Sequence, residues 1–164
     1  PDFLQAVRQE CDRYEIVLIF DEIVTGFRLA YGGAQELYAI APDICTLGKV
    51  IGGDFPLAAI IGRKDIMAHF DKDSVGEQRR LMQLGTLSGN PIAAEAELKS
   101  LEILRHIGAY AMLRQNGEIV MSHVHVALGR KGIHYQIVGD LTLFEIVFAE
   151  SPPKNYRDVQ KGNA

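Results

Sequence analysis

Three groups of residues in this sequence combine residue types and spacing that could do chemistry. Asp21 follows directly on a run of β-branched and aromatic residues. Lys49 stands between a second apolar run and a cluster of glycines, in the stretch TLGKVIGG. The small-residue loop GTLS at 85–88 opens a helix-forming segment. A lysine in such surroundings needs an explanation, because lysines are almost never fully buried without a partner.

Each of these groups has a use in one kind of chemistry. A lysine amine can form a Schiff base with a carbonyl cofactor, and an acid can keep a pyridine nitrogen protonated. Backbone amides at the start of a helix can bind a phosphate group. Open α/β sheets place their ligands at the carboxyl ends of parallel strands, which is where Asp21 and Lys49 are expected. The three groups together meet the requirements of pyridoxal 5'-phosphate (PLP).

Other binding chemistries fit the sequence less well. The segment ending in Gly48-Lys49 is similar to a phosphate-binding loop, but Asp43 stands at its first glycine position and Val50 follows the lysine. His123 and His125 would point about 200° apart on a helix, so they do not predict a metal site. We therefore expect no resident metal ion.

Composition and charge exclude several classes of partner. The chain has 164 residues, of which 48% are hydrophobic, a net charge of −4 and a pI near 5.7. The basic residues are scattered, so we expect no binding of nucleic acid or of an anionic membrane. The apolar runs are too short to span a bilayer and no signal segment opens the chain, so a cytoplasmic location is the default. Cys11 and Cys45 are expected to be reduced, structural thiols.

The elements that must position the candidate residues can be read from the apolar pattern. Residues 3–13 have helical periodicity, and Ile16–Phe20 predicts a strand that is buried on both faces. Further strands are expected at Ile44–Leu47 and Leu57–Ile61. These strands predict an α/β fold with a mainly parallel sheet, although their order and direction cannot be read from the sequence.

The second half of the chain changes character. Asn90 as N-cap and Pro91 at the first helical position predict the start of a long helix. The helical pattern breaks near residues 107–108 and continues to about Leu128, and two strand-like runs follow at 135–138 and 141–148, separated by residues 139–140. We place a boundary to a smaller domain between residues 105 and 118. Because the chain starts at proline and stops in the middle of a segment, we also expect it to be an excerpt of a longer protein.

Four stretches of the sequence resemble one protein family. The stretches at residues 18–28, 31–36, 42–53 and 85–91 resemble the class III PLP-dependent aminotransferases, and are most similar to the glutamate-1-semialdehyde aminomutase subgroup. The resemblance is close over about residues 1–105. It implies the fold type I of PLP-dependent transferases, with residues 1–105 as the second part of the PLP-binding large domain. Residues 106–164 would then begin a small α+β C-terminal domain.

The resemblance also implies a role for each candidate residue. Lys49 would form the Schiff base with PLP, and Asp21 would pair with the pyridine nitrogen. Ile23 would pack on the ring, while Gly85 and Thr86 would contact the phosphate of the other subunit's cofactor, which implies a homodimer. The activity would be transfer of an amino group between an amino donor and a carbonyl acceptor, or an aminomutase reaction. A covalent role predicts a buried Lys49, because an imine carries less desolvation cost than a free charge.

Some positions leave questions open. Val24, Asp54 and Met82 depart from the family pattern, which leaves the substrate undefined. Glu22 and Arg28 fit a structural ion pair at least as well as a catalytic role. An alternative from a different class is a truncated or split scaffold without activity of its own, which would serve only as a binding or dimerisation module.

Overall fold

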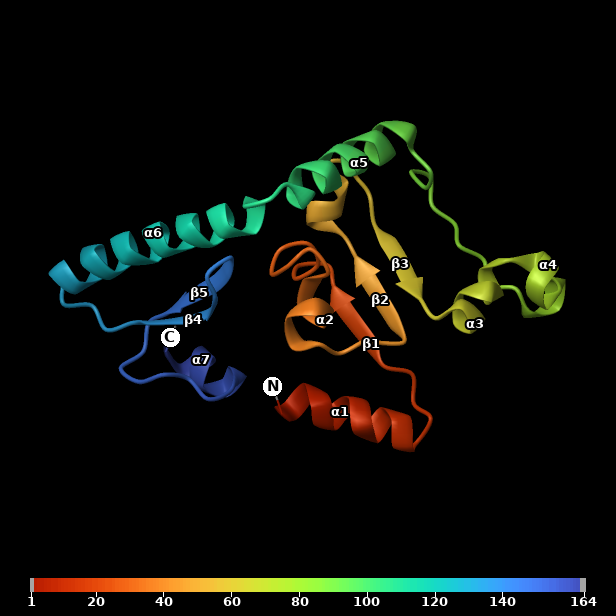
Figure 1. Cartoon of the computed structure of the whole chain (residues 1–164). Coiled ribbons are helices and arrows are strands. Elements are labelled where there is room, and N and C mark those ends of the chain that lie inside the picture. Colours follow the sequence, from red (N-terminus) through yellow and green to blue (C-terminus); the bar gives the residue numbers. More distant parts are fainter. Residues whose placement is uncertain (1, 163–164) are drawn as a thin grey trace. The chain divides into compact units, whose positions relative to one another are not determined.

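The structure, a computed structural model, describes residues 2–162 (Figure 1). The chain divides into two units, one up to His106 and the other from Ile107 on. The first unit holds a three-stranded sheet and the second a two-stranded sheet. Helices accompany both sheets, so the α/β class that the sequence predicts is confirmed.

The sheet of the first unit has the strand order β1-β2-β3. Strand β1 (Ile19–Glu22) pairs in parallel with β2 (Ile44–Leu47), and β3 (Ala59–Gly62) pairs antiparallel with β2. The predicted bounds of the middle strand are confirmed. Strand β1 begins three residues later than the apolar run that starts at Ile16, and β3 begins two residues later than the run that starts at Leu57. The parallel pair matters most, because it places the carboxyl ends of β1 and β2 at the same edge.

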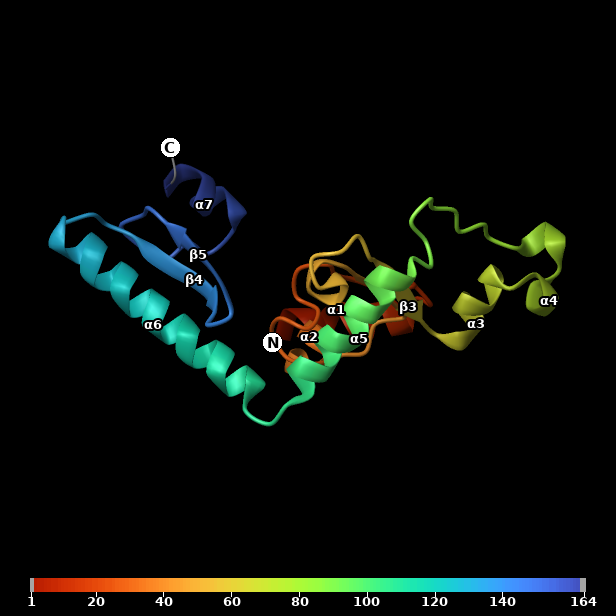
Figure 2. The same ribbon diagram turned by 90° about the horizontal axis from the view of Figure 1, so that it is seen from above.

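The helices of the first unit include one long helix in the position that the sequence predicts. The side chain of Asn90 accepts hydrogen bonds from the backbone amides of Ile92 and Ala93, at 2.9 and 3.3 Å, and Pro91 is the first helical residue. Figures 1 and 2 show this helix, α5, over the turn that follows β2. The α-helices of this unit are α1 (Asp2–Arg13), α2 (Gly33–Tyr38), α3 (Lys64–Met67), α4 (Lys72–Val75) and α5 (Pro91–Arg105), and its 3-10 helices are η1 (Lys49–Gly52), η2 (Ala68–Phe70) and η3 (Glu77–Arg79).

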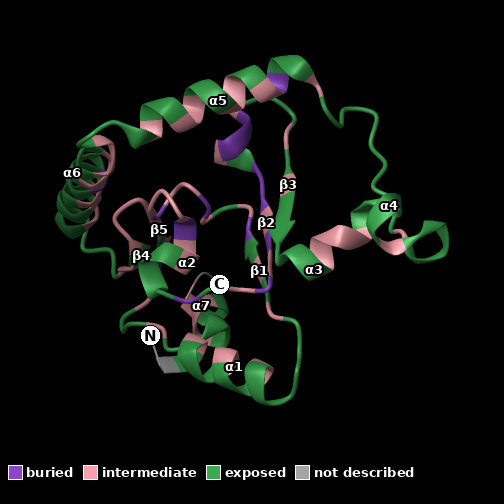
Figure 3. Cartoon of the chain, turned by 45° about the vertical axis from the view of Figure 1, so that its right-hand side comes forward, coloured by how far each residue is buried: buried purple, intermediate pink, exposed green. Residues whose placement is uncertain are grey.

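Burial in the first unit is concentrated on the middle strand and the turn after it (Figure 3). Cys45, Leu47 and Ile51 form the buried cluster. The expectation that Ile16–Phe20 is buried on both faces is wrong, because Ile16 and Ile19 are each 56% exposed. The physical reason is that β1 pairs with only one strand among the described residues, so one edge and part of both faces remain open.

A buried carboxylate joins several elements at the start of β2. Asp43 is only 6% exposed. It accepts hydrogen bonds from the guanidinium of Arg8 in α1 at 2.9 Å and from that of Arg63 after β3 at 2.9 Å. The backbone amide of Leu18, just before β1, donates a third bond at 2.8 Å. The Leu18 amide first, and then Arg63 and Arg8, hold the pKa of Asp43 well below its usual range, since all three bonds favour the charged form.

The second unit consists of a helix and a hairpin. Helix α6 (Ala109–Arg130) precedes the antiparallel strands β4 (Gln136–Asp140) and β5 (Leu143–Val147), and α7 (Tyr156–Gly162) follows them. The separation between the strands lies at 141–142 rather than at the predicted 139–140. The carboxylate of Asp140 explains the shift, because it accepts bonds from the amide and hydroxyl of Thr142 and so forms the turn itself. Figure 2 shows α6 beside the hairpin, and Gly117 of α6 lies against the carbonyl of Leu141.

We expect the substitution Asp43→Asn to lower the free energy of unfolding at pH 7 by about 2–3 kcal/mol, because it weakens three hydrogen bonds to a buried charge. The folded-state pKa of Asp43 lies below its ordinary value of 3.8. The wild-type advantage should therefore be complete above about pH 5 and disappear as the pH falls through the folded-state pKa.

Urea titrations of the complete protein between pH 3 and pH 8 measure this difference. A gap between wild type and Asp43→Asn that stays constant or widens toward low pH would contradict the assignment. Asp71→Asn, at an exposed helix cap, provides a control that should change stability much less.

Candidate functional site

The carboxyl end of β1 places Asp21 beside the neighbouring strand. Asp21 lies opposite Thr46 in the parallel register. Its Oδ1 atom accepts hydrogen bonds from the hydroxyl of Thr46 and from the backbone amide of Ile23, both at 3.1 Å. The side chain is exposed, and its Oδ2 atom accepts no hydrogen bond from residues 2–162. One oxygen therefore holds the carboxylate in place while the other is available to a donor from outside.

Ile23 and Gly48 meet where the two parallel strands end. A Cβ atom on Gly48 would lie 3.3 Å from the Cγ2 atom of Ile23, which is tighter than an ordinary contact. Glycine at this position therefore lets the backbone that carries Lys49 approach the side chain of Ile23. The structure thus brings the predicted residues Asp21, Ile23 and Lys49 to one edge of the sheet.

Lys49 is the first residue of η1 and has an unusual backbone conformation. Its φ angle is +49°, in the left-handed region that residues other than glycine seldom adopt. Strain of this kind persists where surrounding contacts hold the backbone, and here Ile51 and Gly52 are buried. The expectation that Lys49 is buried is wrong, because its side chain is exposed. The described residues enclose the turn after Lys49 but do not cover its amine.

Helix α5 holds the turn that follows Lys49. Gly53 has a φ of +53°, and a Cβ there would lie 2.6 Å from Oγ of Ser100 and 3.2 Å from the carbonyl oxygen of Ala96, both in α5. Asp54 has a φ of +71°. Asp54 thus occupies a left-handed position that glycine adopts at little cost and aspartate at moderate cost.

The predicted phosphate loop lies in a separate part of the first unit. Gly85 and Thr86 are exposed. The carbonyl of Gly85 accepts a bond from the amide of Ser88 at 3.0 Å, and the side chain of Gln83 donates to the Ser88 hydroxyl at 3.0 Å. A hollow of about 550 Å³ lies between this loop and residues 56–58. Among the described residues, no hydrogen bond or ion pair joins Gly85 or Thr86 to Asp21 or Lys49.

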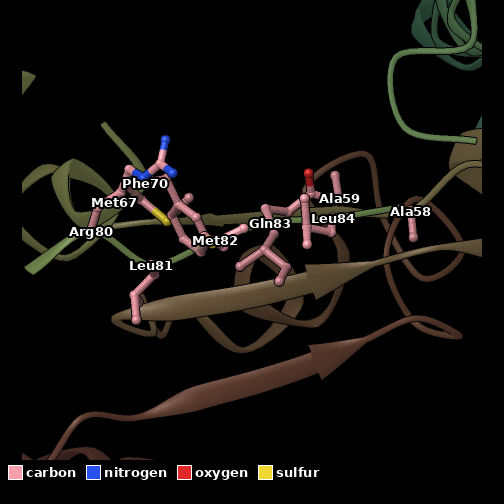
Figure 4. A pocket seen from close by; sticks show the side chains of 10 residues that line it. Ala58, Ala59, Met67, Phe70, Arg80, Leu81, Met82, Gln83 and Leu84 are labelled. Carbon is pink, nitrogen blue, oxygen red and sulfur yellow. The ribbon is translucent and has the colours of Figure 1, made fainter. Parts of the chain in front are cut away.

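A larger hollow, of about 650 Å³, lies between β3 and the extended segment 80–84. Figure 4 shows Met67, Phe70 and Arg80 near one another, while Leu84 lies close to Ala59. The lining of this larger hollow is mainly apolar. It includes none of the five predicted site residues, which are Asp21, Ile23, Lys49, Gly85 and Thr86.

Glu22 is the residue that sequence reasoning left undecided and that the structure defines. Its side chain is 1% exposed and accepts four hydrogen bonds, all from neutral donors. The sequence did contain a signal for this buried carboxylate, because Glu22 stands directly next to Asp21 in a strand. Because neighbouring strand residues point to opposite faces, one of the two had to face inward.

Residues 2–162 contain neither a metal-binding cluster nor a membrane-spanning helix. No group of three or more histidine, cysteine, aspartate or glutamate side chains lies in an arrangement that could hold a metal ion. None of the helices in this part of the chain is both long enough and apolar enough to cross a membrane.

The sequence was then compared with known proteins. A sequence model of the family "Aminotransferase class-III" matches residues 1–147. The chain belongs to this family. A curated relative, glutamate-1-semialdehyde 2,1-aminomutase of Neisseria meningitidis, is 44% identical over 161 residues, which cover 98% of this chain and 36% of the relative. The chain therefore spans little more than a third of the length of the curated relatives it matches.

Solved structures of transaminases share the fold. An omega-transaminase from Sphaerobacter thermophilus superimposes with a TM-score of 0.84 at 33% identity, covering 99% of this chain and 35% of the transaminase. A transaminase with PLP bound gives a TM-score of 0.80 at 33% identity, covering 96% of this chain and 36% of that protein. These likenesses confirm the fold type I that the sequence resemblance implied.

The left-handed backbone at Asp54 generates a prediction. The substitution Asp54→Val should lower the free energy of unfolding by about 1–2 kcal/mol, because a β-branched side chain is costly at positive φ. Asp54→Gly should leave stability within about 1 kcal/mol of wild type, because relief of strain offsets the greater freedom of the unfolded chain. Thermal unfolding of both variants measures the difference, and equal midpoints for Val and Gly would refute it.

Proposed function

We propose that this chain carries the PLP-binding part of a class III aminotransferase or aminomutase, with Lys49 as the covalent attachment point. The observation that supports this most directly is the meeting of Asp21, Ile23 and Lys49 at the carboxyl ends of the parallel strands β1 and β2. Open α/β sheets bind their ligands at this edge. The similar transaminase with PLP bound adds support from outside the chain.

The residues at this edge fit the cofactor chemically. Asp21 offers one carboxylate oxygen that is held by Thr46 and Ile23 and a second that can accept a bond from a protonated ring nitrogen. Gly48 removes side-chain bulk between Ile23 and the turn that carries Lys49. The site thus offers an amine, a carboxylate and an apolar side chain, which are the groups that binding of PLP requires.

When bound, PLP supplies an aldehyde that links to an amine and a ring that withdraws electrons from the substrate's Cα. In this proposal Asp21 keeps the proton on the ring nitrogen through a charge-assisted hydrogen bond. Ile23 packs on one face of the ring and excludes water there. Lys49 would hold the cofactor through its Nζ atom. Once the substrate's amine has replaced Nζ on the cofactor, the released neutral amine of Lys49 would take the proton from the substrate's Cα.

The wider functional assignments are also part of the proposal. Substrates would be a small amino donor and a carbonyl acceptor, and the name of the Neisseria meningitidis relative supports an aminomutase among the alternatives. Residues 1–105 would belong to the cofactor-binding large domain and residues 106–164 to the start of a small C-terminal domain. The protein would act as a cytoplasmic homodimer, in which Gly85 and Thr86 contact the phosphate group in the partner subunit.

The decisive experiment is borohydride reduction of the complete protein after addition of PLP. Wild type should show a visible absorption band that reduction abolishes, with the cofactor fixed on the peptide that contains Lys49. Lys49→Ala should show neither the adduct nor turnover. Lys64→Ala, at an exposed lysine in α3, is a matched control that should label like wild type. Labelling at another lysine, or turnover by Lys49→Ala at the wild-type rate, would refute the proposal.

The phosphate role of Thr86 leads to a separate prediction. Thr86→Ala should weaken PLP binding about 10-fold to 100-fold, because one hydrogen bond to a charged phosphate is lost. Thr86→Ser keeps the hydroxyl and should bind within a few-fold of wild type. Equilibrium dialysis measures both affinities, and sedimentation velocity measures the assembly. Equal binding by Thr86→Ala and wild type would argue against the phosphate contact, and a monomer that binds PLP normally would argue against the dimer.

A further inference from the structure

Glu22 lies at the end of β1 with its carboxylate completely enclosed. Its Oε2 atom accepts a bond from the hydroxyl of Thr25 at 3.0 Å and one from the amide of Ala34 at 2.6 Å. Its Oε1 atom accepts bonds from the backbone amide of Gln35 at 3.0 Å and from the side-chain amide of Gln35 at 3.2 Å. The carboxylate therefore joins β1 to the first turn of α2 and to the loop between them.

The four donors match an ionised carboxylate and no other side chain of this size. Both oxygens face N–H groups, and an ionised carboxylate is a pure acceptor. A glutamine at this position would place an NH2 group against at least one backbone N–H. Gly33, with a φ of +72°, lies so close that a Cβ there would overlap Oε2 of Glu22. The surroundings are thus shaped around this one group.

The backbone of Glu22 is held as well as its side chain. Its carbonyl oxygen accepts a bond from the amide of Gly26 at 2.9 Å, and a Cβ on Gly26 would lie only 2.7 Å from that oxygen. Both ends of Glu22 are therefore tied to the segment 25–35. The peptide that joins Glu22 to Asp21 shares this restraint, and the two side chains of neighbouring strand residues point to opposite faces.

We propose that Glu22 is a positioning residue, which fixes the end of β1 so that Asp21 presents its carboxylate to the ring nitrogen of the cofactor. The inference rests on the proposed function of Asp21 and deepens it. Glu22 itself does not touch the cofactor in this arrangement. It acts through the peptide it shares with Asp21, because a shift of the strand end moves both residues together.

A buried carboxylate elsewhere in the same sheet provides a matched control. Asp43 is also enclosed and accepts three hydrogen bonds, against four for Glu22, but it lies at the opposite end of β2 from the candidate site. Loss of either carboxylate should destabilise the protein. Only loss of Glu22 should alter the environment of the bound cofactor.

The experiment compares the variants Glu22→Gln and Asp43→Asn in the complete protein loaded with PLP. The measurements are the thermal midpoint, the wavelength of the visible absorption band and the dissociation constant for PLP. Glu22→Gln should shift the band and weaken PLP binding about 10-fold, since the charge-assisted bond that the ring nitrogen donates to Asp21 would be misaligned. Asp43→Asn should lower the midpoint while leaving the band in place and binding within about twofold.

A milder variant covers the case in which Glu22→Gln does not fold. Thr25→Val removes one donor to Oε2 and should produce a smaller shift of the band in the same direction. Amide hydrogen exchange provides a readout without cofactor. The backbone amides of Ala34 and Gln35 donate to Glu22, so they should lose protection from exchange in Glu22→Gln and keep it in Asp43→Asn.

The outcomes separate this inference from the proposed function. If wild type binds PLP but both Thr25→Val and Glu22→Gln keep the wild-type band and affinity, the positioning role is wrong and the proposed function stands. If Asp43→Asn shifts the band as much as Glu22→Gln, the effect is general destabilisation and the inference is again overturned. If wild type shows no band with PLP, the proposed function fails and this inference fails with it.

Discussion

The parallel pairing of β1 with β2 is the constraint on which the candidate site depends. Parallel strands end at the same edge of a sheet, so a residue at the end of one lies beside a residue at the end of the other. Here the register sets Asp21 opposite Thr46, and the chain then continues through Ile23 on one strand and Gly48-Lys49 on the other. An acid and an amine that are far apart in the sequence are thereby brought to the same place.

Buried carboxylates restrain the strands of this pair. Asp43 ties the start of β2 to α1, to the segment before β1 and to the end of β3. Glu22 ties the end of β1 to the loop and helix that follow it. Each oxygen of both carboxylates accepts at least one hydrogen bond, and Asp43 is also paired with two guanidinium groups, which lowers the cost of burying their charge. The thiol of Cys45 lies near Glu22 in the same buried region. Burial, and then the negative charge of Glu22, raise the pKa of this thiol and favour its neutral form.

The turn after β2 shows how helix packing supports an unfavourable backbone. Lys49, Gly53 and Asp54 all have positive φ angles within six residues. The close approach of Gly53 to Ser100 and Ala96 explains how α5 holds this turn. The amine of Lys49 extends outward from a backbone that is fixed on its other side. A rigid backbone with an accessible amine suits the covalent role that we propose for Lys49.

The sequence by itself determined the features that depend on local chemistry. The run at 44–47 was strand-like, Asn90 and Pro91 set the start of α5, and the order of four motifs identified the family, because each of these signals is carried by neighbouring residues. Burial and side-chain partners were decided by the tertiary structure. Exposure of Ile19 and Lys49 depends on which elements cover them, and the choice of Glu22 rather than Asp21 as the inward carboxylate depends on where the loop at 25–35 returns to the strand. Contacts between residues that are distant in the chain determine these features, so the pattern of neighbouring residues does not predict them.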